Sequence, residues 1–227
     1  MNWSLKGDRF VLEGVPGVSI FTTTRRYLLP DGLPAPVELR DFVERVGHAP
    51  AAVVGMEQVH GATIRLVNQV SDAVLPKCDG LVTNQPRVAL TLRSADCLPL
   101  IAYDPFQRVV GVAHAGWRGV KARIPEQLVG AMERSQVLVG IGPGIGPCCY
   151  AVGKEFEEWF GAHLRTRNGT RYLDLGEAAT AQLVNAGVPH ENIYPAPWCT
   201  SCETDNCHSY RRDGAAAGRM LTCAMLT

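Results

Sequence analysis

Two histidines and one cysteine are the residues of this sequence that could build a metal centre. His60 lies in "QVHG", Cys97 in "SADCLP" and His114 in "VAHAGWRG", each at the end of an apolar run or in the turn after it. Two imidazoles and a thiolate are ligands that Zn²⁺ prefers, and three protein ligands leave one tetrahedral position open for catalysis. The long separations leave two alternatives, a hydrogen-bonded histidine at a strand end and an inert core cysteine.

A second set of candidate ligands lies near the C-terminus in "CTSCETDNCH". Cys199 and Cys202 have the spacing Cys-x-x-Cys, and Cys207 and His208 follow them. This set could hold a structural Zn²⁺ or form a redox pair, and ordinary packing is the interpretation that we favour.

The glycine run "GIGPGIGPCCY" could close a pocket, because Gly142, Gly144 and Gly146 would let backbone N–H groups approach an anion. Its spacing matches neither a dinucleotide-binding loop nor a Walker loop. The alternative is a strand-to-loop turn with positive φ angles. Cys148, in the same run, could lie on the pocket wall or be a buried structural thiol.

The apolar runs predict the elements that position these residues. Helices are expected over 37–47, from 119 to about 132 with Pro125 starting or kinking its main part, over "GKEFEEWFGAHL", and over "DLGEAATAQLVNAGV" with Asp174 as N-cap and Gly187 as C-cap. The segment 29–36 reads as a loop. Strands are expected in "RFVLEG", "GVSIFTT", "AAVVGMEQVHG", "ATIRLVN", "CDGLVTN", "RVALTLRSADCLPLIAYD", "RVVGVAHAG", "QVLVGIG", "NIYPAP" and "GRMLTCAML".

Because strands and helices mix without a regular βαβ alternation, we expect an α/β (α+β) fold with a mixed central sheet. No linker divides the chain, so residues 1–227 are expected to form a single domain. The apolar face of the helix over 37–47 is predicted to consist of Leu39, Phe42, Val43 and Val46.

Composition excludes several classes of partner. Lys and Arg number 22 and Asp and Glu number 22, so we expect no non-specific binding to nucleic acid or to an anionic membrane. No apolar run approaches the roughly 18 residues that span a bilayer. The stretch "MNWSLKGDRFVLEG" does not read as a signal peptide, which predicts a cytoplasmic protein. Its eight cysteines are then expected to be reduced thiols, metal ligands or nucleophiles.

Six motifs occur in an order that resembles a known family: "QVHG", "CDGLVT", "SADCLPL", "HAGWRG", "GIGPGIGPCCYAVG" and "CT…SYRRDG…GR". The sequence resembles, over roughly residues 52 to 226, the laccase-domain proteins labelled multicopper polyphenol oxidoreductases. Those labels have been revised toward purine nucleoside phosphorylase and, in bacterial members, toward peptidoglycan editing. The resemblance implies a layered α/β sandwich similar to the catalytic domain of cytotoxic necrotizing factor. It also places the family's zinc ligands on His60, Cys97 and His114, with Cu²⁺ as the other metal left open.

The resemblance implies phosphorolysis of adenosine, inosine and S-methyl-5′-thioadenosine, with purine nucleosides and phosphate as substrates. Arginine suits phosphate because it donates two parallel hydrogen bonds. Arg93 and Arg118 lie beside the proposed ligands, and Arg211 and Arg212 are further candidates, each with a surface ion pair as the alternative. A hydrogen-bond donor or acid for the leaving purine could come from Asp96, Tyr150 or Gln58.

The turn after His114 has a structural role whether His114 binds a metal or only forms hydrogen bonds. Gly116 and Gly119 would permit a tight turn and close backbone packing, and Trp117 is expected in the core. Cys97, His114 and Asp96 are the residues that we expect to act in catalysis.

Three other functions stay open. Adenosine deamination is a second activity that the resemblance implies, although the usual deaminase signature H-x-E…P-C-x-x-C is absent. A cysteine- or metal-dependent amide hydrolase that edits peptidoglycan precursors would use Cys97 as nucleophile and His60 or His114 as base. A non-catalytic metal or partner-binding module would bind zinc without turnover. The six histidines argue against a four-copper polyphenol oxidase, which needs on the order of ten imidazole ligands. The sequence does not fix the oligomeric state.

Overall fold

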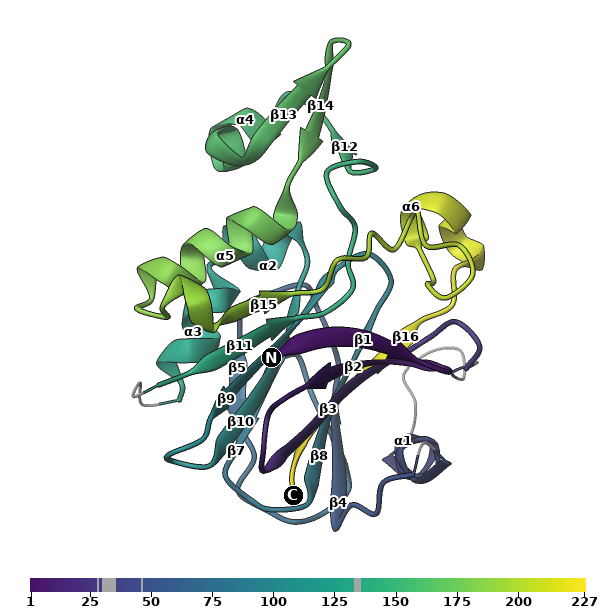
Figure 1. Cartoon of the computed structure of the whole chain (residues 1–227), viewed down its shortest axis with the longest axis vertical. Coiled ribbons are helices and arrows are strands. Elements are labelled where there is room, and N and C mark those ends of the chain that lie inside the picture. The colour runs from purple at the N-terminus through teal and green to yellow at the C-terminus, as the bar shows by residue number, and fades with distance from the viewer. Residues whose placement is uncertain (28, 30–35, 46, 133–135) are drawn as a thin grey trace.

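Two large mixed sheets pack face to face, and helices cover their outer faces (Figure 1). The computed structural model describes residues 1–27, 29, 36–45, 47–132 and 136–227. Within that part of the chain, the layers run from one helix through a seven-stranded sheet and a six-stranded sheet to a group of three helices. The prediction of a mixed α/β sandwich is confirmed.

The seven-stranded sheet joins segments from the two ends of the chain. Its order is β1 (Asn2–Lys6), β2 (Arg9–Glu13), β3 (Val18–Thr23), β16 (Met220–Leu226), β8 (Val88–Ser94), β4 (Ala52–Met56) and β6 (Ala73–Leu75). Neighbours from β1 to β8 are antiparallel, whereas β4 runs parallel to β8 and β6. The C-terminal strand therefore lies in the middle of this sheet.

The six-stranded sheet contains β10 (Val109–Ala115), which carries His114, and β9 (Leu98–Asp104), which begins directly after Cys97. Its order is β15 (Ile193–Pro195), β11 (Leu138–Ile141), β9, β10, β7 (Gly80–Thr83) and β5 (Ile64–Leu66). Strand β8 belongs to one sheet and β9 to the other, so the short turn between them crosses from sheet to sheet.

The long apolar runs of β8, β9 and β10 follow from this layering, because each strand faces a hydrophobic core on both sides. Successive side chains of a strand point to opposite faces. In β9, Ile101 faces the core between the sheets, whereas Leu100 and Ala102 face the core under the helices. Burial on both faces removes the alternation of apolar and polar residues that a half-exposed strand would show.

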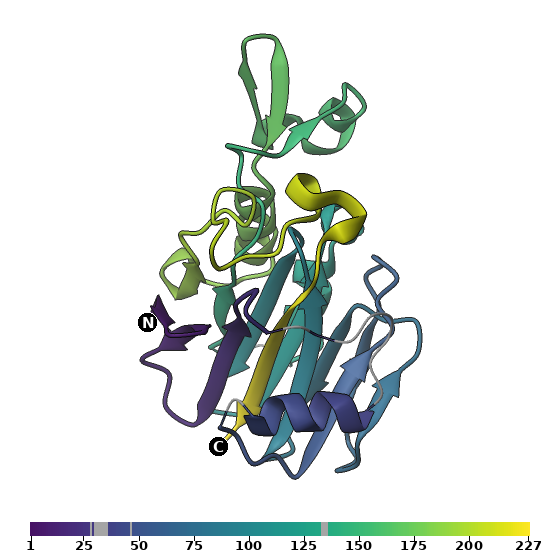
Figure 2. The same cartoon turned by 90° about the vertical axis from the view of Figure 1, so that its right-hand side faces the viewer.

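Helices cover both outer faces. Helix α1 (Pro36–Arg45) lies across the seven-stranded sheet, where Leu39 and Val43 are buried (Figure 2). The side chains of Phe42 and Val46, and most of the expected loop over 29–36, lie outside the described residues. Helices α2 (Trp117–Lys121), α3 (Ile124–Gly130) and α5 (Leu175–Asn185) pack on the six-stranded sheet.

The helix expected from 119 to about 132 is divided in two. Arg123 adopts a left-handed conformation with φ 66°, and Pro125 lies at the start of α3, where its missing N–H costs no hydrogen bond. In α5, the Asp174 side chain accepts a hydrogen bond from the Glu177 N–H, as the N-cap prediction requires. Gly187 has φ 96°, just beyond the last helical turn.

A third, smaller sheet projects from the sandwich at the top of Figure 1. It consists of β12 (Ala151–Val152), β14 (Thr170–Leu173) and β13 (Leu164–Arg167), beside α4 (Phe156–Phe160) and the 3₁₀ turn Gly161–His163. These strands, together with β1 and β6, were not predicted from the sequence, because they are short and only partly buried. The remaining short helices are α6 (Tyr210–Asp213) and the 3₁₀ turns His190–Asn192 and Gly214–Ala216. Among the described residues, no helix has the length and apolar character needed to cross a membrane.

Candidate active site and metal centre

The fold brings His60, Cys97 and His114 together at one end of the strands. One ligand atom of each lies within 4.8 Å of the others. His60 is in the loop after β4, Cys97 is in the turn that crosses from β8 to β9, and His114 is near the end of β10. The two imidazole rings are 4.8 Å apart and nearly perpendicular. This is a donor set that suits a soft or borderline metal ion, and its exposed side is formed by His60.

Asp79 orients this cluster, and the sequence analysis missed it. Its carboxylate accepts a hydrogen bond from His114 Nδ1 at 3.0 Å, which leaves Nε2 for a ligand. It also accepts hydrogen bonds from the N–H groups of Val59, His60 and Gly61, at 3.1, 2.9 and 2.7 Å. A carboxylate behind a ligating histidine fixes the tautomer and the ring orientation. The sequence signal that could have found it is an aspartate directly before an apolar strand, in "CDGLVT". In the structure this aspartate is fully buried.

Charges in the cluster favour the thiolate form of Cys97, which can bind a metal, and the protonated form of His114, whose proton on Nε2 a metal ion would displace. Burial alone would raise the pKa of Cys97, but hydrogen bonds and charge from His114 and His60 outweigh it and lower the pKa to about 6. Burial alone would lower the pKa of His114, but Asp79 and the Cys97 thiolate raise it to about 9. The pKa of Asp79 stays below its usual value because its hydrogen bonds, first that from His114, outweigh the effect of burial.

Two glycines let the turn after β10 approach the other ligands. A Cβ on Gly116 would lie 2.7 Å from Cys97 Sγ, and a Cβ on Gly119 would lie 3.0 Å from the carbonyl oxygen of Gly61. A side chain at either position would push the ligand-bearing segments apart. Trp117 is half-buried against the helical core and stacks on Trp159, with the ring centroids 5.5 Å apart.

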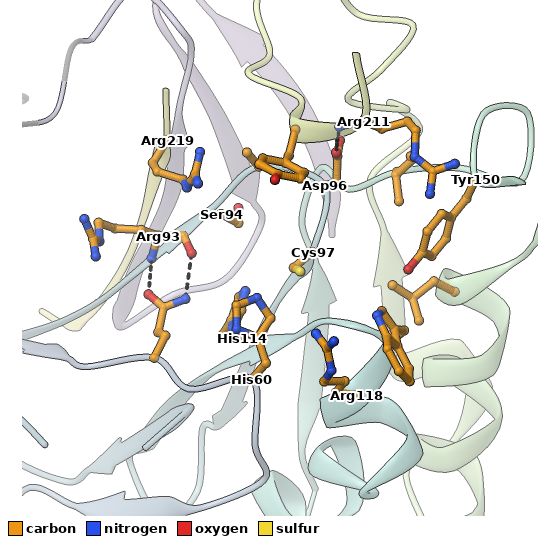
Figure 3. A pocket seen from close by; sticks show the side chains of 16 residues that line it. His60, Arg93, Ser94, Asp96, Cys97, His114, Arg118, Tyr150, Arg211 and Arg219 are labelled. Carbon is orange, nitrogen blue, oxygen red and sulfur yellow. Dashed lines mark hydrogen bonds between the residues drawn. The ribbon is translucent and has the colours of Figure 1, made fainter. Parts of the chain in front are cut away.

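A cavity of about 470 Å³ opens beside the cluster, a volume typical of small-molecule sites. Its lining includes eight residues that were expected at the site: Gln58, His60, Arg93, Asp96, Cys97, His114, Arg118 and Tyr150. It also includes Ser94, Tyr210, Arg211 and Arg219. Arg93 and Arg219 lie on one side, and Arg118, Tyr150 and Arg211 on the other, with His60, Cys97 and His114 between them (Figure 3).

The arginines make the cavity strongly cationic. Burial and the nearby charge of Arg219 lower the pKa of Arg93. The guanidinium of Arg118 lies 4.6 Å from the Trp117 ring centroid. The Ser94 hydroxyl is buried at the cavity and has no hydrogen-bond partner among the described residues. Like charges held side by side, with a free hydroxyl beside them, form a site for an anion such as phosphate.

Gln58 and Asp96 have their polar atoms engaged. The Gln58 side chain donates to the Arg93 carbonyl at 2.8 Å and accepts from the Arg93 N–H at 2.9 Å, which ties the loop after β4 to β8 (Figure 3). The Asp96 carboxylate accepts hydrogen bonds from Thr200 Oγ1 and from the Arg211 N–H, both at 2.6 Å. Asp96 has φ 88°, so this turn is held in an uncommon conformation. Both side chains position neighbouring residues of the cavity.

The two arginines of "SYRRDG" separate into different environments. Arg211 lines the cavity, with its guanidinium 5.1 Å from the Tyr150 ring centroid. Arg212 forms an ion pair with Asp213 and donates to the carbonyls of Thr200 and Cys207, so it stabilises the loop behind the site. Burial raises the pKa of Tyr150 to about 12, which keeps its phenol protonated as a donor.

The glycine run after β11 owes its composition to close packing. Among the described residues with positive φ angles, Gly142, Gly144 and Gly146 do not occur, so the alternative of a strand-to-loop turn with positive φ angles was wrong. A Cβ on Gly142 would lie 2.7 Å from Pro99 Cγ, and a Cβ on Gly144 would lie 2.4 Å from Leu98 Cδ2. The segment therefore fits against β9 only without side chains at these positions.

A family model described as multi-copper polyphenol oxidoreductase laccase matches residues 37–227. The chain belongs to this family. The resemblance inferred from the six motifs is thereby confirmed, and the match begins earlier than residue 52.

Relatives within the family carry names of nucleoside enzymes. The chain is 40% identical over 188 residues to purine nucleoside phosphorylase YlmD of Geobacillus stearothermophilus, which covers 73% of this chain and 69% of that protein. It is 30% identical over 247 residues to adenosine deaminase RL5 of an unidentified prokaryote, covering 92% and 94%. The crystal structure of Bacillus licheniformis hypothetical protein YfiH is similar with a TM-score of 0.89 and 28% identity, covering 99% of both chains. The likeness to cytotoxic necrotizing factor stays a prediction.

Proposed function

We propose that this chain is a metal-dependent purine nucleoside phosphorylase. It would split adenosine, inosine and S-methyl-5′-thioadenosine with phosphate into the free base and a sugar 1-phosphate. The observation that carries the proposal is one cavity in which His60, Cys97 and His114 face a group of arginines. The name of the relative from Geobacillus stearothermophilus supports the same reaction.

Phosphate would bind among the arginines. Arg93 and Arg219 crowd two positive charges on one side of the cavity, next to the unpartnered Ser94 hydroxyl. A dianion between them would relieve their repulsion and accept charge-assisted hydrogen bonds. Asp96 is the one carboxylate among the described residues of the lining, and its oxygens accept hydrogen bonds from Thr200 and Arg211, which limits its repulsion of phosphate.

The nucleoside would lie between this anion site and the wall formed by Trp117 and Tyr150. In phosphorolysis, the bond from C1′ to the base nitrogen breaks while a phosphate oxygen bonds to C1′, through an oxocarbenium-like state. The departing base takes up the proton that monohydrogen phosphate loses as its oxygen bonds to C1′. The Tyr150 phenol, which its raised pKa keeps protonated, lines the cavity and would donate a hydrogen bond to the departing base. Arg118 and Arg211 would stabilise negative charge as it develops.

The donor set fits a zinc ion with an open fourth position, because the ligand atoms converge and Asp79 fixes the tautomer of His114. Zn²⁺ held by His60, Cys97 and His114 would supply a positive charge that polarises a substrate oxygen or activates water. Cu²⁺ is the alternative occupant, and metal analysis of the purified protein distinguishes the two.

Product analysis tests the proposal. The purified protein, with its metal content measured, is incubated with adenosine with and without phosphate, and products are separated by chromatography. Adenine and ribose 1-phosphate should form only with phosphate and should be lost in His114→Ala. Absence of both products at full metal loading would overturn the proposal.

Adenosine deamination is a second reaction for the same cavity, favoured by the name of the relative RL5. Water would replace the 6-amino group, giving inosine and ammonia. The same chromatography detects inosine without added phosphate. Its formation at wild-type metal content and its loss in His114→Ala would assign this reaction to the site.

The row Cys97, His114 and Asp79 favours one further candidate, an amide hydrolase acting on peptidoglycan precursors. His114 lies between a thiol of lowered pKa and an orienting carboxylate, as a nucleophile–base–acid row requires. This candidate predicts full amide hydrolysis by the metal-free protein and loss on alkylation of Cys97. Loss of all amide hydrolysis when the metal is removed would exclude this candidate.

A further inference from the structure

A second cluster of thiols lies outside the cavity. Cys148 and Cys149 follow the glycine run after β11, and Cys199 and Cys202 lie in the segment between β15 and α6. The four sulfur atoms lie within 4.8 Å of one another. Cys202 Sγ is 3.5 Å from Cys148 Sγ and 3.4 Å from Cys149 Sγ. The fold therefore gathers a Cys-Cys pair and a Cys-x-x-Cys pair from distant parts of the sequence.

These distances suit a tetrahedral ion and not a disulfide. Four thiolates about 2.3 Å from Zn²⁺ form a tetrahedron whose sulfur atoms are about 3.8 Å apart. The separations of 3.4 and 3.5 Å, and the limit of 4.8 Å for the whole set, bracket that value. A disulfide needs about 2.05 Å. All eight cysteines, each in the described part of the chain, are free thiols.

The backbone around the cluster is organised to hold it. The Gly146 N–H donates to Cys199 Sγ at 3.2 Å, a contact that stabilises a thiolate. The Thr200 N–H donates to the Gly144 carbonyl at 3.0 Å, which ties the two segments together. A Cβ on Gly146 would lie 3.2 Å from Cys199 Cβ and 3.3 Å from Cys148 Sγ. Gly146 is thus needed for the two cysteine pairs to approach.

The cluster borders the cavity without entering it. Tyr150, which lines the cavity, directly follows Cys149, and Thr200, which donates to Asp96 at 2.6 Å, lies between Cys199 and Cys202. None of the four cysteines is among the described residues that line the cavity. An ion here would brace the wall that carries Tyr150 and the Asp96 contact, and four protein ligands would leave no open position for substrate.

We propose that Cys148, Cys149, Cys199 and Cys202 bind one Zn²⁺ ion as a closed, structural four-thiolate site. This partner set differs from the one that the sequence spacing offered for Cys199 and Cys202. Cys207 is fully buried in the core between the sheets, and His208 packs against Gly218, so neither joins the cluster. Soft thiolate ligands select zinc over the harder divalent cations.

Metal content separates the two sites in the full chain. Protein prepared under reducing conditions in the presence of Zn²⁺ should contain about two zinc ions per chain. Cys148→Ser and Cys202→Ser should each lose about one of them and keep the ion that His114→Ala loses. Cys207→Ala, which removes a thiol of the same segment outside the cluster, should retain both. Wild-type zinc content in Cys148→Ser and Cys202→Ser would overturn the proposal, whatever His114→Ala shows about the cavity.

A measurement on the unaltered chain covers the case in which these variants do not fold. Replacing zinc by ¹¹³Cd²⁺ should give two resonances, one at the low field typical of four sulfur ligands and one from a mixed nitrogen and sulfur set. A spectrum without the four-sulfur resonance would overturn the proposal. Peptide mapping that finds Cys202 in a disulfide with Cys148 or Cys149 in freshly reduced, zinc-loaded protein would do the same.

Discussion

The molecule has two clusters of candidate metal ligands, one in the cavity and one made of four thiols, and they differ in their donor atoms and in the residues around them. The cavity cluster has three donors, two of them imidazoles, and a buried carboxylate behind His114. The thiol cluster has four sulfur donors, and backbone N–H groups in place of a carboxylate hold Cys199. Three donors leave a position where substrate can meet the ion, whereas four donors fill the coordination sphere. In the two proposals, the number of ligands is therefore what separates a catalytic site from a structural one.

The residues around the two clusters also differ in whether their charges are balanced within the chain. Around the cavity, charged side chains such as Arg93 and Arg219 are crowded in a way that an anion would relieve. Around the thiol cluster, contacts are made within the chain, through Gly144, Gly146 and Thr200. The surroundings of the cavity cluster therefore favour binding of an external anion, whereas those of the thiol cluster favour stabilisation of the segments that carry the four cysteines.

The largest effect should come from His114→Ala, which removes a ligand of the cavity cluster. A catalytic metal contributes several kcal/mol to the transition state, so phosphorolysis of adenosine should fall about 10³-fold or more. Cys202→Ser should keep most of its turnover and lose thermal stability instead. Steady-state kinetics and thermal unfolding of both variants check this contrast, which fails if the two variants lose activity equally.

Asp79→Asn should come next. The amide keeps the size of the side chain but removes the negative charge that holds His114 Nδ1. Loss of such a partner lowers metal affinity or activity about 10- to 100-fold. Competition with a chelator measures the affinity. Asp104→Asn is the matched control, because Asp104 is a buried carboxylate that accepts backbone N–H groups away from the cavity. Equal losses in both variants would assign Asp79 to stability alone.

Arg219→Ala tests the anion site of the cavity. A charge-assisted hydrogen bond contributes about 1.5 to 3 kcal/mol, so KM for phosphate should rise about 10- to 100-fold, with a smaller change in KM for adenosine. Arg165→Ala removes an exposed arginine that pairs with Asp174 and Glu177, and it should leave both constants unchanged. An unchanged KM for phosphate in Arg219→Ala would place the anion elsewhere.

The smallest effect should come from Thr200→Val, which cuts the hydrogen bond that links the two clusters. The Thr200 hydroxyl is buried and donates to Asp96. A hydrogen bond to a carboxylate is worth about 1.5 to 3 kcal/mol, but Asp96 keeps the Arg211 N–H and Thr200 lies outside the cavity lining. Only about 1 kcal/mol should therefore reach the transition state, so kcat/KM should fall about fivefold while zinc content stays at the wild-type level. Thr200→Ser restores the hydroxyl and should restore the rate. Loss of zinc in Thr200→Val would show that the two clusters are not independent.

Much of the fold could be predicted from the sequence, because its signals are local. The buried strands β8, β9 and β10, the N-cap at Asp174 and the role of Pro125 follow from apolar runs and from the conformations of single residues. The small projecting sheet could not be predicted, since its strands are short and only partly buried. The glycine run was misinterpreted because its requirement is close packing against β9 and not a positive φ angle.

The sequence by itself determined which residue types were available and the family to which they belong. It supplied His60, Cys97 and His114, and its motif order identified the family that the comparison confirms. Only the tertiary structure decided which side chains meet. It placed Asp79 behind His114 and paired Cys199 and Cys202 with Cys148 and Cys149 instead of Cys207 and His208. The physical reason is that a ligand set forms where the ends of different strands meet in space. The turn from β8 to β9 passes from one sheet to the other, and the order of the strands along the chain does not reveal that these two sheets pack together.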